Sequence, residues 1–373
     1  MRKLLLALPA LAVALAAVAT SPGTPAQAAP VSLTVTAGDG EPGYAVNTFL
    51  PSSISINAGD TITWEWDWPE PHSITFGQIT GDPTPPSHPG VDVVDYDGTG
   101  FVNSGFLWPQ GDDAASFAVK FTETGTFDYY CFVHPFMTGK VYVQGPGVGV
   151  QDTQAALDAR GALEYSDNLA ALKAAAAQAA AKPVAISSKA GGGREYTLQV
   201  SSNNDIPVGD VMQFFPASLN VGINDSVKFV SNVHTPHNIA FIPPGVDLSG
   251  PPPPELADWD PFEGGVNYTV GTKLDNSKFV ASPIIGLEYP DGLSATFAFA
   301  KTGTYNYVCI LHAEQAMAGT INVTATAPGA PNTGDTMTAL PMQQSGTLGL
   351  LLVMGSVAIA MGATTIAFAA SRR

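Results

Sequence analysis

The feature that most constrains the fold is a long internal repeat. Segment 49–60 (FLPSSISINAGD) returns as 215–225 (FPASLNVGIND), and each copy then runs through an apolar stretch to a Pro-His pair. Farther along, 124–131 (TGTFDYYC) returns as 302–309 (TGTYNYVC). This period is far longer than that of a solenoid repeat, so the repeat indicates a duplicated domain.

Each copy contains short segments in which apolar and polar residues alternate, such as 53–56 (SISI), 61–66 (TITWEW) and 115–121 (ASFAVKF). Alternation with β-branched and aromatic residues is typical of antiparallel strands with one buried face. The 38 glycines and 31 prolines also favour strands and turns over long helices. About seven or eight such strands in roughly 110–130 residues predict a Greek-key β-sandwich for each copy, so the fold class is all-β.

The segment between the copies has a different composition. Residues 151–181 are rich in Ala, Leu and Gln, which favours helix. We expect one or two helices that space the domains or pack on one of them. Gly161 is expected to break a first helical piece. Residues 166–167 (SD) are expected to cap a second helix, which stops at Pro183. A flexible joint is expected at 190–193 (AGGG).

The chain begins with the pattern of a signal peptide. Two basic residues, Arg2 and Lys3, precede an apolar run over 4–19, and small residues follow at 25–29 (PAQAA). A basic start, a short apolar run and a small-residue cleavage site are typical of export signals. The sequence therefore predicts that the body of the protein lies outside the cytoplasm.

The other end of the chain carries a longer apolar run, 348–370, without a charged residue and followed by Ser-Arg-Arg. At about 1.5 Å per helical residue it is long enough to cross the ~30 Å hydrocarbon core of a bilayer. The terminal arginines favour the cytoplasmic side. A buried core helix is one alternative. Another is cell-wall attachment, because 330–334 (APNTG) resembles a sortase signal with Ala in place of Leu.

These patterns divide the chain into seven parts. They are a signal peptide (1–29), a first sandwich (30–145), an Ala-rich helical linker (146–193), a second sandwich (194–325), a further linker (326–346), a transmembrane anchor (347–370) and a cytoplasmic tail (371–373).

The chain has two cysteines, Cys131 and Cys309, and in an exported protein they could form a disulfide. However, they occupy equivalent places in the repeat, so a bridge would join two identical strand ends across domains. Each is also followed by a histidine and a methionine: the loops read Cys-x₂-His-x₂-Met and Cys-x₂-His-x₄-Met. This pattern favours metal binding over a disulfide.

The residue types indicate which metal. A thiolate and two imidazoles with a weak axial thioether form the trigonal arrangement of type 1, or blue, copper. Cys, His and Met on one short loop can converge on a single point, and the Pro-His pair at 71–72 or 236–237 supplies the second histidine of each copy. A structural zinc site would require four strong ligands, and no second Cys or third His is near.

Both copies resemble the cupredoxin family of blue copper proteins. The segment 129–141 (YYCFVHPFMTGKV) is similar to amicyanin, whereas the longer second loop resembles those of plastocyanin and pseudoazurin. The resemblance implies two type 1 copper ions per chain, one in each domain. It implies eight ligands: His72, Cys131, His134 and Met137 in the first domain, and His237, Cys309, His312 and Met317 in the second.

Two local differences predict that the two copper centres differ in reduction potential and in partner. Asn238 follows the first ligand of its copy as is usual in the family, whereas Ser73 departs from that pattern and is expected to alter hydrogen bonding around the first thiolate. The residues 135–136 (PF) suggest an apolar docking patch beside His134, and 313–315 (AEQ) a more polar patch in the second domain.

The remaining histidines, His88 and His234, are expected to be a solvated loop residue and a surface residue near the second site. A copper enzyme of the nitrite reductase type would need a histidine directly beside the type 1 cysteine. Those positions hold Tyr130 and Phe132 in the first copy, and Val308 and Ile310 in the second. The sequence therefore predicts an electron carrier and not an enzyme.

The leading hypothesis is a membrane-anchored electron carrier or two-centre relay that serves redox proteins of the cell envelope. The formal net charge of −17 makes nucleic acid a poor partner and suits a basic protein. A copper-handling surface protein is the alternative, and reversible one-electron cycling discriminates between the two.

Overall fold

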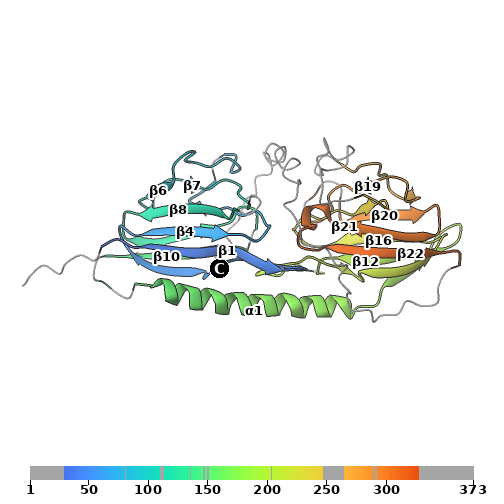
Figure 1. Ribbon diagram of the computed structural model, residues 1–373, viewed down its shortest axis with the longest axis horizontal. Helices are drawn as coiled ribbons and strands as arrows, with labels where there is room; N and C mark the ends of the chain where they lie inside the picture. Colours follow the sequence, from blue (N-terminus) through green and yellow to red (C-terminus); the bar gives the residue numbers. More distant parts are fainter. Residues whose placement is uncertain are drawn as a thin grey trace, which may run out of the picture.

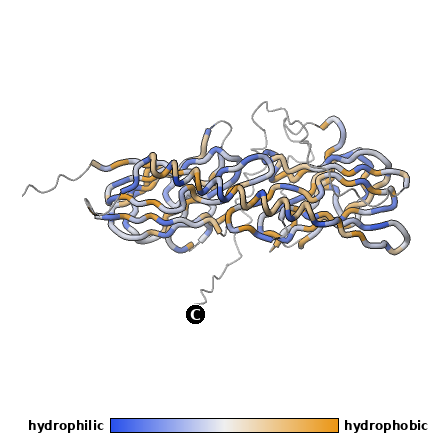
Figure 2. Tube along the Cα trace, turned by 90° about the horizontal axis from the view of Figure 1, so that it is seen from below, coloured by the Kyte–Doolittle hydropathy of each residue, from blue (hydrophilic) through white to orange (hydrophobic). Residues whose placement is uncertain are grey.

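A computed structural model describes residues 29–326, apart from 80, 110–112, 135, 146–147, 149–150, 203, 247–263, 288 and 290–291. It consists of two β-sandwich lobes placed end to end, with one long helix lying along both (Figure 1). Hydrophobic and hydrophilic positions are interspersed along the chain of both lobes (Figure 2). The two expected sandwiches are confirmed.

The first sandwich consists of a six-stranded and a five-stranded sheet. The first sheet runs β13 (Gly209–Val211), β2 (Tyr44–Leu50), β1 (Ser32–Glu41), β4 (Thr61–Trp66), β8 (Ala115–Phe121) and β6 (Val93–Tyr96). The second runs β3 (Ser53–Asn57), β10 (Thr138–Gln144), β9 (Gly125–Tyr130), β5 (Thr75–Phe76) and β7 (Val102–Asn103). The alternation of β4 places Ile62, Trp64 and Trp66 in the core between the sheets.

The second sandwich repeats this plan. One sheet runs β11 (Ala185–Ser188), β12 (Arg194–Val200), β16 (Ser226–Ser231), β20 (Ser294–Phe299) and β18 (Thr272–Leu274), with β14 (Phe214–Phe215) also paired to β12. The other runs β15 (Ser218–Gly222), β22 (Ala318–Thr324), β21 (Gly303–Val308), β17 (Ala240–Ile242) and β19 (Val280–Ala281). The parallel pairs β3–β10 and β15–β22 correspond, as the duplication requires.

The segment between the sandwiches differs from the expectation. One uninterrupted helix, α1 (Gln154–Ala180), is capped by Thr153, whose side chain accepts a hydrogen bond from the Ala156 N–H. The expected break at Gly161 and cap at 166–167 are wrong. Gly161 instead lets the helix approach the first sandwich, because a Cβ there would lie 3.0 Å from the Leu50 carbonyl. The end of the segment is also not purely helical, since β11 falls within it.

The two halves share a sheet. Strand β13, which belongs to the second half of the sequence, pairs antiparallel with β2 of the first sandwich, with Asp210 opposite Ala45. Gly209 has a φ of 147°, and a Cβ there would lie 2.0 Å from the Ala45 carbonyl oxygen, so only glycine fits. Buried side chains of α1, including Leu172, pack against β2 and β13 in one hydrophobic cluster. The lobes are therefore held together by main-chain pairing and by apolar packing.

No helix among residues 29–326, where they are described, is long and apolar enough to cross a membrane. The expected signal peptide (apart from residue 29) and the expected anchor at 347–370 both lie outside the described residues.

Candidate metal centres

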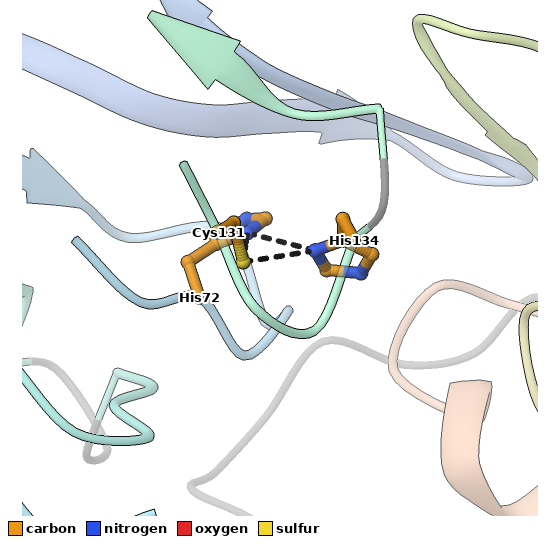
Figure 3. A group of neighbouring side chains, drawn as sticks. All are labelled: His72, Cys131 and His134. Atoms are coloured by element: carbon orange, nitrogen blue, oxygen red, sulfur yellow. Dashed lines mark hydrogen bonds between the residues drawn. The ribbon is translucent and has the colours of Figure 1, made fainter. Parts of the chain in front are cut away.

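In the first sandwich, three of the predicted ligands converge (Figure 3). The Nδ1 atoms of His72 and His134 are 3.1 Å apart. The Cys131 Sγ lies 3.6 Å from Nδ1 of His134 and 4.0 Å from Nδ1 of His72. The three side chains therefore present two ring nitrogens and one sulfur to a single point.

The second sandwich repeats the triangle with its own residues. The Nδ1 atoms of His237 and His312 are 3.2 Å apart. The Cys309 Sγ lies 3.4 Å from Nδ1 of His312 and 3.9 Å from Nδ1 of His237. Neither cysteine is in a disulfide, which removes the alternative pairing of Cys131 with Cys309.

Each triangle has a suitable size to hold one metal ion of its own. Two imidazole nitrogens about 2.0 Å from an ion in a trigonal plane would lie about 3.5 Å apart, close to the separations found here. One thiolate and two imidazoles are the donor set that suits copper. His72 and His237 are fully buried, and their Nε2 atoms have no hydrogen-bond partner, so Nδ1 is the functional end of each ring.

Burial keeps the donor groups neutral when no cation is near. Desolvation raises the pKa of the Cys131 thiol and raises that of Cys309 to about 12. Desolvation lowers the pKa of His134 to about 4, and desolvation together with the charge of His134 lowers the pKa of His312 to about 3. A bound cation reverses this penalty for the thiols, because the metal ligand is the thiolate.

A hairpin places the cysteine, histidine and methionine of each loop. In the first loop, the Cys131 N–H donates to the Met137 carbonyl at 2.9 Å, and the Met137 N–H donates to the His134 carbonyl at 3.0 Å. In the second, the Cys309 N–H donates to the Met317 carbonyl at 3.0 Å. A short 3₁₀ helix, η2 (Ile310–His312), follows this cysteine. The two additional residues lie between His312 and Met317, where Ala316 has a left-handed φ of 63° and the Met317 N–H donates to the His312 carbonyl at 3.1 Å.

Both methionines are fully buried within the same core clusters as the cysteines. The backbone of each methionine lies beside that of its cysteine, and both methionine side chains are buried from water.

The residue after the first histidine ties the cysteine loop to its neighbour in both copies. The Ser73 N–H donates to the Cys131 Sγ at 3.3 Å, and the Ser73 hydroxyl accepts from the Phe132 N–H at 2.9 Å. The Asn238 N–H donates to the Cys309 Sγ at 3.5 Å, and its Oδ1 accepts from the Ile310 N–H at 2.8 Å. Serine therefore preserves both bonds that asparagine makes.

One residue that shapes the first centre was not found from the sequence. Gly38 lies in β1 with a φ of 78°, and a Cβ there would fall 2.2 Å from Nε2 of His72. The irregular pairing of β1 with β2 between residues 37 and 39 brings this backbone against the ring. Glycines at 38 and 40 are the available signal, because a glycine within a strand often marks a bulge or a close approach of another group to the backbone.

His88 and His234 do not join either cluster. The His88 ring contacts the Ser87 hydroxyl at 2.6 Å in its own loop. His234 pairs with Asp205, with 2.7 Å between Nδ1 and Oδ2. Both therefore agree with the non-ligand roles expected of them.

The environments of the two loops differ, but not in the way that was expected. Phe136 is 48% exposed beside His134, while Pro135 lies outside the described residues. In the second loop, Gln315 does not contribute to an outward polar patch. Only 1% of it is exposed, because it is packed against the first sandwich.

The fold and the paired His-Cys-His sites define a two-domain cupredoxin. The family model for copper binding proteins of the plastocyanin/azurin family matches two segments of the sequence, residues 41–144 and 198–324, which together make up more than half of the chain. The chain therefore belongs to this family.

Similar proteins include amicyanin-alpha of Methylorubrum extorquens, 33% identical over 36% of this chain and 97% of its own length. Chloroplastic plastocyanin of Tetradesmus obliquus is 31% identical over 26% of this chain and 58% of its own length. Among solved structures, a Cu(I) form of an amicyanin variant matches 30% of this chain and 82% of its own, at 22% identity and a TM-score of 0.21. Membership of this family of electron carriers confirms the expectation that the chain is not an enzyme.

Proposed function

We propose that the protein is a membrane-anchored, extracytoplasmic electron-transfer protein that binds two type 1 copper ions. The observation that carries the proposal is the occurrence of one His-Cys-His triangle in each sandwich with nearly the same three distances. Copper held by such a donor set cycles between Cu(I) and Cu(II) and thereby exchanges single electrons.

The chain's own residues fix the donors in place. His72 and His237 are held by backbone pairing with Leu107 and Ile285, and both rings are fully buried. Because His72 and His237 are fixed by β-bridges and the other ligands by a hydrogen-bonded loop, the donors cannot rearrange freely when the charge at the centre changes. Met137 and Met317 are proposed as the axial ligands. This rigidity is what single-electron exchange requires, since it keeps the geometry alike in both oxidation states.

The location and the partners are part of the same proposal. A cleaved signal peptide (1–29) and an anchor (347–370) would hold the body outside the cell membrane, with sortase-type attachment at 330–334 as the less favoured mode. The partners are redox proteins of the cell envelope, and the charge of −17 suits a basic one. The exposed ring of Phe136 beside His134 supports docking at the first centre.

The test is an optical and EPR titration of the protein with copper, repeated with Cys131→Ser and Cys309→Ser. The wild-type chain is expected to bind two equivalents with thiolate charge-transfer bands, and each substitution is expected to remove one. Retention of both bands in either variant would refute the ligand assignment. Failure of the bound copper to cycle reversibly would instead favour a copper-handling role.

A further inference from the structure

The second metal centre lies against the first sandwich. His312 is 4% exposed, and its Nε2 atom lies 3.9 Å from Oε1 of Glu70, a residue of the first sandwich that is itself 3% exposed. The other ring nitrogen, Nδ1, faces Cys309 and His237. One ring therefore has its metal-binding end in the second domain and its far end against a carboxyl group of the first.

Glu70 is held in this position from several directions. Its Oε1 accepts a hydrogen bond from Nε2 of Gln315 at 3.0 Å. Its backbone carbonyl accepts from Nε1 of Trp66 at 3.1 Å, and its N–H donates to the Trp68 carbonyl at 2.7 Å. The main chain of Gln315 is fixed as well, because its carbonyl accepts from the Gly43 N–H at 2.8 Å. These hydrogen bonds fix the carboxyl group of Glu70 at the junction between the two sandwiches.

We propose that Glu70 of the first domain is a positioning residue of the second metal centre. Its carboxyl oxygen faces Nε2 of His312 at 3.9 Å, which is longer than a hydrogen bond, and accepts the Nε2–H when metal binding at Nδ1 draws the two groups together. The inference rests on the proposed function. An imidazole that binds a metal ion through Nδ1 carries its proton on Nε2, and such a group commonly donates to a carboxylate that fixes the orientation of the ring. Burying a carboxyl group is costly unless it is hydrogen-bonded, which explains why its partners are present.

The repeat shows that this arrangement is not reciprocal. Glu70 stands two residues before His72, and the equivalent residue of the second copy, two before His237, is Thr235. The Thr235 hydroxyl donates to Asp210 at 2.5 Å within the second half of the chain. The first domain therefore completes the second centre, and the contact has arisen in one direction only.

The test uses full-length protein in which one centre has been removed at a time. In the Cys131→Ser background, which leaves only the second centre, Glu70→Leu removes the acceptor and Glu70→Gln retains an oxygen at the same place. We expect Glu70→Leu to weaken copper binding at least tenfold and to change the EPR spectrum of the second centre. Glu70→Gln is expected to restore binding to within about threefold, because it keeps the acceptor.

The Cys309→Ser background is the matched control, because Glu70 lies only two residues from His72 in the sequence. If Glu70 acted locally, Glu70→Leu would disturb the first centre. We expect that centre to keep its spectrum and affinity. An effect confined to the first centre, or equal at both, would overturn the inference.

A direct readout is the Nε2–H signal of His312 in the ¹H–¹⁵N spectrum of the Cu(I)-loaded protein with labelled histidine. It is expected to be protected from exchange in the wild-type chain and to shift in Glu70→Leu. If Glu70→Leu does not fold, Gln315→Leu gives the same test, because it leaves Glu70 but removes the amide that holds it. Absence of any copper at the second centre in Cys131→Ser alone would defeat the proposed function. Normal binding that is insensitive to Glu70→Leu and Gln315→Leu would defeat only this inference.

Discussion

Replacing Gly38 with alanine tests how closely the first centre depends on backbone packed against its histidine. Gly38 has a left-handed φ of 78°, and the new Cβ would fall 2.2 Å from Nε2 of His72. The conformational strain costs about 1–2 kcal/mol, and overpacking a buried contact adds about 1–3 kcal/mol. The substitution is therefore expected to lower the free energy of unfolding of the apo protein by about 2–5 kcal/mol.

Gly100→Ala is the matched control, because Gly100 lies in the same sandwich with a φ of 77°, and a Cβ there would have no atom within 4 Å. It carries the conformational strain but not the collision. Urea unfolding of both apo variants measures the difference, and the thiolate band of the first centre in Cys309→Ser protein reports the histidine. We expect Gly38→Ala to weaken or shift that band and Gly100→Ala to leave it unchanged. Equal destabilisation and an unchanged band in both variants would show that the backbone does not constrain the His72 ring.

Two further predictions concern the domain junction and the membrane. Burial raises the pKa of Asp210 to about 6, so its folded-state pKa lies above its unfolded value of 3.8, and the stability that it contributes is lost as pH rises from about 4 through 6. The free energy of unfolding of Asp210→Asn, measured relative to wild type in urea unfolding of the apo protein, should therefore be up to about 3 kcal/mol higher at pH 8 than at pH 4. A difference between the two proteins that does not depend on pH would contradict the assignment. Deleting 347–373 should release the exported protein from the membrane fraction without loss of copper binding, whereas continued membrane association would exclude this segment as the anchor.

The sequence was sufficient to predict the two sandwiches and the convergence of two histidines and one cysteine in each of them. The reason is that the information is local or repeated: strand alternation, the short Cys-x₂-His spacing, and a Pro-His pair at the same place in each copy. The ligand triangles of His72 and His237 follow from these features without knowledge of how the halves meet.

The junction between the halves could not be predicted in the same way. Helical propensity suggested a break at Gly161, but tertiary contact with Leu50 makes the glycine a place of close approach within one helix. Gln315 looked like part of a polar surface, yet it is buried by Glu70 of the other sandwich. Such outcomes depend on contacts between segments far apart in the chain, about which spacing and periodicity carry no information.

The pairing of β13 with the first sheet limits how this chain can be divided into fragments. The strand that completes the edge of the first sheet is encoded after the helix and after the start of the second sandwich, so no single cut separates two complete domains. A fragment that stops before residue 209 would expose the edge of β2, and an open strand edge invites pairing with other chains. A gene fragment that encodes the first sandwich alone is therefore expected to give a protein that aggregates more readily than the whole chain.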